Sequence, residues 1–172
     1  LKSLLAAFPG INFCWEDAGL SMESSTVYLN LGPQQRSAEE IFRLAELLPH
    51  LREIRMGGAA LGLKDLEALA ARLPEVLLLQ DVAFDDRSIS TDSEEIDLSG
   101  LSLTVPEVED MMVCFPKATR YILCGCGIDD ETMDALNRKY EDIRFVWSVR
   151  IKNVDVRTDT KWFYPFKYYR EM

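Results

Sequence analysis

The sequence lacks several features that mark enzymes. It contains one histidine, His50, and four cysteines in 172 residues. A lone imidazole has no evident partner for acid–base chemistry, and no serine or cysteine stands in the sequence context of a nucleophile elbow or a Cys–His dyad. A glycine-rich phosphate loop is also missing. These absences predict a protein that is not an enzyme and has no cofactor.

Long apolar runs and an excess of basic residues are missing as well. No stretch of about 18 consecutive apolar residues occurs, so this segment is not expected to insert into a membrane. The formal net charge is −10, and the isoelectric point is about 4.6. Nucleic-acid binding needs a basic face that releases counterions from phosphates, which excludes nucleic acid as the expected partner. The acidity is expected to serve solubility.

The residues that bind metals are sparse and poorly spaced for that purpose. Cys14, Cys114, Cys124 and Cys126 are too few and too unevenly placed for a disulfide scaffold in a chain of this length. The acidic residues at 107–110 and 129–131 fall at expected helix starts, where carboxylates favour the helix dipole, and they do not have EF-hand spacing. We therefore predict no metal site, with Cys126 buried and reduced.

What the sequence does contain is an internal repeat. A shift of 67 positions aligns most of the chain, for example Ile54 with Tyr121 and Leu69 with Leu136. The super-repeats are predicted at about 1–28, 29–95 and 96–162, within a single domain of residues 1–172. The N-terminal segment fits this alignment if two residues are missing from the loop after Trp15.

Each period contains recognisable local patterns. Apolar strand markers recur at Ile54, Val76, Ile96, Tyr121, Ile143 and Phe163. Amphipathic spacing predicts helices over 37–48 and 63–73 and over their copies at 105–115 and 129–140. The shortest unit has alternating apolar residues around 82–89 and again around 149–156, which predicts a hairpin-like excursion.

The pattern L-x-x-L-x-L-x-x-N/C-x-L fits residues 51–61 and again 118–128, and on this motif the chain resembles leucine-rich-repeat proteins of the ribonuclease-inhibitor-like kind. Residues 143–159 also resemble a segment of uncharacterised repeat proteins of anaerobic gut bacteria. The resemblance implies an α/β fold, a right-handed solenoid in which about seven short, mostly parallel strands form one curved sheet with helices outside. It implies a binding or surface role and supplies no catalytic residues. An extracellular or cell-surface bacterial location is favoured.

In such a fold the residues between the inward strand markers project onto one face. The predicted binding residues on this face are Tyr28, Asn30, Arg55, Leu77, Leu79, Asp97, Arg120 and Arg144. An apolar centre at Leu77 and Leu79, flanked by the three arginines, suits a protein or peptide, or a glycan, with apolar anchors and an acidic group. The sequence thus predicts an interaction module.

Two alternatives remain open. The aromatic segment WFYPFKYY at 162–169 is predicted to form a C-terminal cap over 162–172, and if exposed it would be a platform for glycans. The chain begins at Leu1 without a methionine and its third period stops after Phe163, which favours a structural spacer or a piece of a longer repeat array. The sequence does not decide among these alternatives.

Overall fold

The computed structural model describes residues 2–8, 10–17, 19–85, 87–151 and 153–162. The chain divides into two compact units, the first built from residues 1–93 with 109–117 and the second from residues 94–108 with the chain from 118 onward. Helix α4 (Val105–Met112) contributes its first half to the second unit and its second half to the first.

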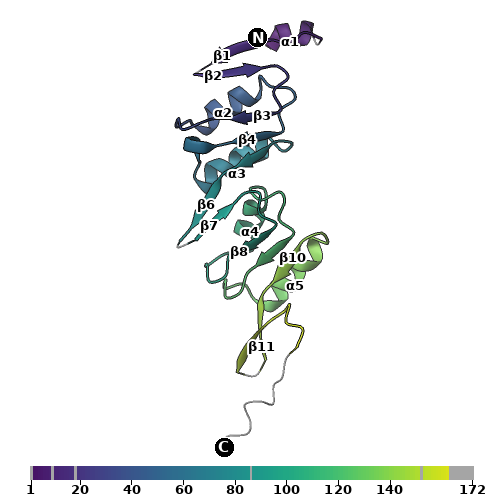
Figure 1. Ribbon diagram of the computed structural model, residues 1–172. Helices are drawn as coiled ribbons and strands as arrows, with labels where there is room; N and C mark the ends of the chain where they lie inside the picture. The colour runs from purple at the N-terminus through teal and green to yellow at the C-terminus, as the bar shows by residue number, and fades with distance from the viewer. Residues whose placement is uncertain (1, 9, 18, 86, 152, 163–172) are drawn as a thin grey trace, which may run out of the picture. The chain divides into compact units, whose positions relative to one another are not determined.

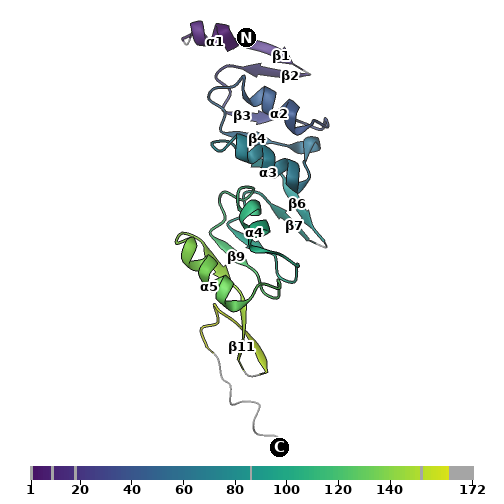
Figure 2. The same ribbon diagram turned by 180° about the vertical axis from the view of Figure 1, so that it is seen from behind.

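The first unit is built around a three-stranded parallel sheet in the order β3-β4-β5. Helices α2 and α3 pack against each other beside this sheet (Figure 1, Figure 2). Antiparallel hairpins precede and follow the sheet in sequence. The elements are α1 (Lys2–Ala7), β1 (Cys14–Asp17), β2 (Leu20–Glu23), β3 (Tyr28–Asn30), α2 (Ala38–Ala45), β4 (Glu53–Arg55), the 3-10 turn η1 (Gly57–Ala59), α3 (Leu63–Arg72), β5 (Leu77–Leu79), β6 (Asp81–Phe84) and β7 (Arg87–Ser90).

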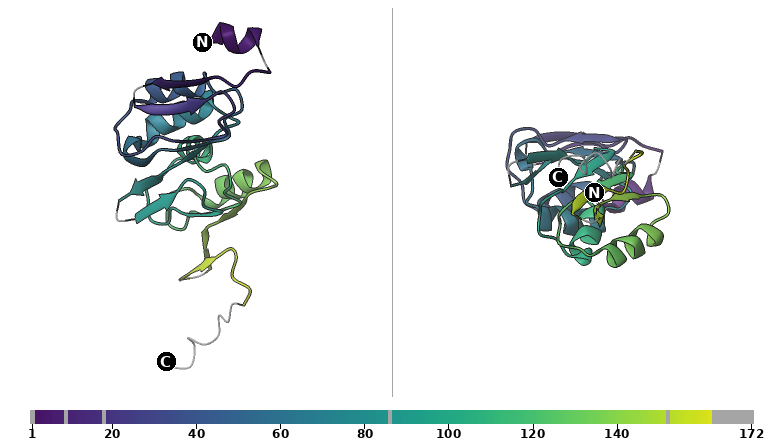
Figure 3. Two further views of the ribbon diagram at one scale, coloured as in Figure 1. Left: turned by 45° about the horizontal axis from the view of Figure 1, so that its top comes forward. Right: turned by 90° about the horizontal axis from the view of Figure 1, so that it is seen from below.

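The second unit has the same plan. Its parallel sheet has the order β10-β9-β8, and an antiparallel hairpin follows it. Helix α5, green in Figure 3, packs beside β10. The elements are β8 (Glu95–Asp97), β9 (Arg120–Ile122), α5 (Asp130–Lys139), β10 (Arg144–Val146), β11 (Ser148–Ile151) and β12 (Val154–Arg157).

Local sequence signals explain where the helices begin. The Ser37 hydroxyl accepts a hydrogen bond from the N–H of Glu40, and the Glu40 carboxylate accepts one of 2.8 Å from the N–H of Ser37. This capping box satisfies two backbone donors at the start of α2. Its copy at the start of α4 keeps the return bond, 2.8 Å from the N–H of Thr104 to Glu107. The four predicted helices are confirmed, with ends that differ by a few residues.

The 67-residue repeat continues into the hydrogen bonding. Three residue pairs, each 67 positions from the next, make the same two hydrogen bonds. In each pair the side-chain hydroxyl of the second residue accepts a hydrogen bond from the N–H of the first, at 3.0, 3.1 and 3.2 Å. The N–H of the second residue donates to the carbonyl of the first, at 2.8, 3.0 and 2.8 Å. The pairs are Phe13 with Ser24, Gln80 with Thr91, and Trp147 with Thr158. The 67-residue spacing therefore holds from residue 13 onward, and the prediction that two residues are missing after Trp15 is wrong.

The core follows the predicted inward positions. Ile54, Met56 and Tyr121 have no exposed surface, and Leu123 and Cys126 are 2% exposed. The predicted markers Val76 and Ile143 are wrong by two residues, since β5 and β10 place Leu78 and Phe145 at their buried centres. Aromatic contacts add to the second core, where the ring centroids of Tyr121 and Phe145 lie 5.7 Å apart.

The predicted solenoid with one curved sheet is wrong. The described residues form two separate three-stranded parallel sheets and three two-stranded antiparallel sheets. In the first unit the reason lies in the hairpin after β5, which the alternating residues correctly predicted. The Leu78 carbonyl on edge strand β5 bonds the Thr91 hydroxyl at 2.6 Å, so a side chain occupies an acceptor that a further parallel strand would need.

Candidate functional site

Five of the predicted binding residues meet on the first parallel sheet. The strand register places Tyr28, Glu53 and Leu77 in one row and Asn30, Arg55 and Leu79 in the next. The residues between the rows, Leu29, Ile54 and Leu78, are buried. Because side chains alternate along a strand, the two rows share the opposite face from the core. We call these six residues the first strand face.

An open groove of about 590 Å³ lies at one end of this face. It contains the row of Asn30, Arg55 and Leu79, together with residues from the turn after β4 and from the base of the β6-β7 hairpin. The other lining residues are Gly57, Ala60, Gln80, Asp81, Ser90 and Asp92.

Side-chain and backbone contacts fix the walls of the groove. The Gln80 amide accepts a hydrogen bond of 2.9 Å from the N–H of Leu61 and donates one of 2.8 Å to its carbonyl. Gly57 has a φ of +53°, and a Cβ on it would lie 2.3 Å from the carbonyl oxygen of Gly32. Only glycine permits this close approach of two turns. The groove is therefore held in shape without a ligand.

The charges in the groove are arranged unevenly. Arg55 Nε lies 3.3 Å from Glu53 Oε1, and the arginine side chain is 69% exposed. Glu53 is only 20% exposed, but water around the arginine screens the pair, so the guanidinium remains accessible to a partner. Across the groove the Ser90 hydroxyl donates a hydrogen bond of 2.7 Å to Asp92 Oδ1. The groove thus combines apolar surface at Leu79 with one exposed cation and exposed carboxylates.

The corresponding face of the second unit is more closed. Its rows are Glu95, Arg120 and Arg144, then Asp97, Ile122 and Val146. Ile122 and Val146 are 5% and 0% exposed, in contrast to the half-buried Leu79 of the first unit. This face offers little apolar surface to a partner.

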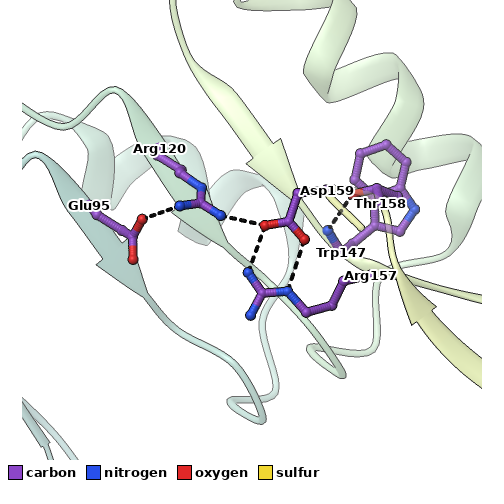
Figure 4. A network of polar contacts seen from close by, with 6 residues as sticks. All are labelled: Glu95, Arg120, Trp147, Arg157, Thr158 and Asp159. Atoms are coloured by element: carbon purple, nitrogen blue, oxygen red, sulfur yellow. Dashed lines mark hydrogen bonds and ion pairs between the residues drawn. The ribbon is translucent and has the colours of Figure 1, made fainter. Parts of the chain in front are cut away.

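A network of charged side chains lies over this second face (Figure 4). The Arg120 guanidinium bonds both Glu95 and Asp159. Arg157 donates to both oxygens of Asp159, from Nε to Oδ1 at 3.0 Å and from Nη2 to Oδ2 at 2.8 Å. These hydrogen bonds, first from Arg157 and then from Arg120, lower the pKa of Asp159, whose side chain is only 15% exposed.

The structure therefore separates the predicted site residues. Tyr28, Asn30, Arg55, Leu77 and Leu79 belong to the first sheet, whereas Asp97, Arg120 and Arg144 belong to the second. The predicted arrangement of three arginines around Leu77 and Leu79 on one sheet is wrong. Arg120 is moreover engaged by two carboxylates of its own unit, while Arg144 is exposed.

The predicted binding residues do not include the hairpin side of the groove, which Gln80, Asp81, Ser90 and Asp92 form. A signal for them existed, because residues 91–93 and 158–160 have the sequences Thr-Asp-Ser and Thr-Asp-Thr in the two super-repeats. A conserved turn sequence within one chain marks a position with a structural or binding role.

Other candidate sites gain little support. Cys126 is buried as predicted, with its thiol 3.1 Å from the Leu98 carbonyl. Among the described residues no group of three or more His, Cys, Asp or Glu side chains is arranged to hold a metal ion. No helix in the described part of the chain has the length and apolar character needed to cross a membrane. The predicted cap lies outside the described residues except for Trp162, which is 78% exposed.

No family model matches this chain, and no curated protein or solved structure shows a significant similarity to it.

Proposed function

We propose that this protein is a non-enzymatic interaction module that binds a protein or peptide segment through the first strand face and the groove at its end. The observation that carries this proposal is the grouping of Asn30, Arg55 and Leu79 in one open groove. Apolar surface beside an exposed arginine is typical of the centres of protein interfaces.

The preformed groove supports the same proposal. The two hydrogen bonds between the Gln80 amide and the Leu61 backbone, and the close approach of Gly57 to Gly32, fix both walls of the groove through contacts within the chain. A rigid site avoids part of the entropy that is lost when loops become ordered on binding. Tyr28, which is 71% exposed, adds an aromatic surface at the edge of the face.

The test begins with a screen of the purified protein against a peptide array, followed by titration calorimetry of the ligands found. Leu79→Lys removes the apolar anchor, and Arg55→Glu reverses the exposed charge. Either change should weaken binding at least about tenfold, the loss expected when a central interface residue is removed.

Matched controls lie on the helices. Arg43→Glu on α2 and Arg138→Glu on α5 make the same charge change on exposed helix residues that belong to neither strand face. Ligands that survive these controls but are lost with Leu79→Lys support the proposal. A spacer predicts a different result, in which no ligand depends on Leu79 or Arg55, and that result would refute the binding function proposed for this face.

A further inference from the structure

The two units have the same turn at the end of their hairpins, but the aspartate in this turn has different hydrogen-bond partners in each unit. Asp92 and Asp159 are 67 positions apart and each follows a threonine. The two threonines make the same pair of contacts, with the backbone of Gln80 in one unit and of Trp147 in the other. Each aspartate is thus attached at the same place relative to its own sheet.

In the second unit two arginines surround this aspartate. Arg157 bonds both oxygens of Asp159, and Arg120 adds a further bond while also bonding Glu95 (Figure 4). Counting back 67 positions, the first unit has Ser90 in place of Arg157 and Glu53 in place of Arg120. Neither equivalent residue supplies a cation to Asp92.

The carboxylate of Asp92 is exposed and lines the groove. Its hydrogen bond from Ser90 reaches only Oδ1. The nearby Arg55 has its Nε on Glu53. In the second unit, arginines of the chain itself bind the carboxylate of Asp159. The equivalent carboxylate of Asp92 has no such arginine from these positions, and it lines the groove together with Leu79.

We propose that Asp92 anchors an arginine side chain of an extended peptide, in the place that arginines of this chain occupy around Asp159. The proposal rests on the proposed function and names the chemistry of the partner. Glu53 provides a second carboxylate on the first strand face, and in the second unit Glu95 provides a second carboxylate for Arg120. The residue 67 positions before Glu95 is Tyr28, whose ring is exposed. A guanidinium suits both groups, since it pairs with carboxylates and stacks on aromatic faces.

The geometry around Asp159 favours arginine over lysine. Arg157 uses two nitrogens in a fork that matches the two carboxylate oxygens. A lysine ammonium is a point charge that does not reproduce this planar contact. The net charge of −10 assists the approach of a cationic peptide.

The experiment uses the full chain and a capped pentapeptide, acetyl-Ala-Leu-Arg-Leu-Ala-amide, with versions in which citrulline or lysine replaces the arginine. Citrulline keeps the shape of arginine and removes its charge. Binding is measured by NMR titration of the backbone amides, with those of Ser90 and Asp92 as the local report. The arginine peptide should bind about tenfold more tightly than the citrulline peptide, as expected for a hydrogen bond between charged groups. Lysine should fall between them.

Two sets of variants locate the effect. Asp92→Asn should lower the affinity for the arginine peptide to that of the citrulline peptide, whereas Asp155→Asn, on an exposed part of β12, should leave it unchanged. The double variant Glu53→Arg, Ser90→Arg introduces arginines at the positions equivalent to Arg120 and Arg157. These arginines should pair with Asp92, so the variant should bind the arginine and citrulline peptides equally.

The outcomes separate this inference from the proposed function. Equal binding of the arginine and citrulline peptides, or an Asp92→Asn variant that keeps the preference, overturns the inference. So does a peptide array whose Leu79-dependent ligands contain no arginine, and in that case the binding function stands. Absence of any ligand that depends on Leu79 overturns both.

Discussion

The Thr91 hydroxyl donates a hydrogen bond of 2.6 Å to the carbonyl of Leu78 and accepts one of 3.1 Å from the N–H of Gln80. The threonine is completely buried, so water does not replace either contact. It joins the base of the β6-β7 hairpin to the edge of the first parallel sheet, and it therefore holds one wall of the candidate groove.

Thr91→Val keeps the shape of the side chain and removes both hydrogen bonds. The buried backbone groups of Leu78 and Gln80 then lose a partner, which should lower the free energy of unfolding by about 1–3 kcal/mol. Urea denaturation followed by circular dichroism measures this change. The control is Thr158→Val, because Thr158 accepts the equivalent bond at 3.2 Å but is exposed. A loss with Thr158→Val as large as that with Thr91→Val would contradict the role assigned to burial.

Asp159 should make stability depend on pH. Its pKa is lowered in the folded state by Arg157 and Arg120. A carboxylate with a depressed folded pKa stabilises the protein above its unfolded pKa of about 3.9 and loses this contribution as the pH falls through the folded value. Asp159→Asn should therefore be less stable than the wild type at pH 7, and the difference should shrink below about pH 4. Unfolding curves from pH 7 to pH 2 test this, and a constant difference over that range would count against it.

The four cysteines should differ in reactivity. Burial, together with the nearby Glu67, raises the pKa of Cys114 to about 12, and burial also raises the pKa of Cys126. Because the thiolate is the reactive form, both should resist iodoacetamide at pH 8 in the native protein. Cys14 is exposed and Cys124 half-buried, so labelling should proceed in that order. Mass spectrometry of peptides labelled with and without urea gives the rates. Native labelling of Cys114 as fast as that of Cys14 would refute the prediction.

Gly57→Ala should damage the groove. The residue has a φ of +53°, and the added Cβ would lie 2.3 Å from the Gly32 carbonyl oxygen. Backbone strain and this contact together should cost about 1–3 kcal/mol of unfolding free energy. Gly100→Ala is the matched control, since Gly100 has a φ of +81° and open space around its Cβ position. The loss should be larger at Gly57, and thermal unfolding of both variants compares them. Equal losses would mean that the contact with Gly32 adds nothing.

The local structure of this protein is determined by short stretches of its sequence. The sequence correctly predicted helices α2 to α5, the β6-β7 and β11-β12 hairpins, the 67-residue period and the buried positions of Ile54, Tyr121 and Cys126. Each follows from local rules, because helix caps, alternation and apolar spacing act between residues that are close in the chain. On these points the sequence by itself was sufficient.

The tertiary structure decided how far the sheets extend and which face stays open. The end of the first sheet depends on a side-chain hydrogen bond from Thr91 to Leu78, which no pattern of apolar residues reveals. The ion-pair network of the second unit joins Arg120, Arg157 and Asp159, which lie up to 39 positions apart in the chain. In the first unit Glu53 and Ser90 stand in the places of those arginines and leave Asp92 exposed. Such contacts arise only when distant side chains are brought within hydrogen-bonding distance, and for this reason the groove was found in the fold and not in the sequence.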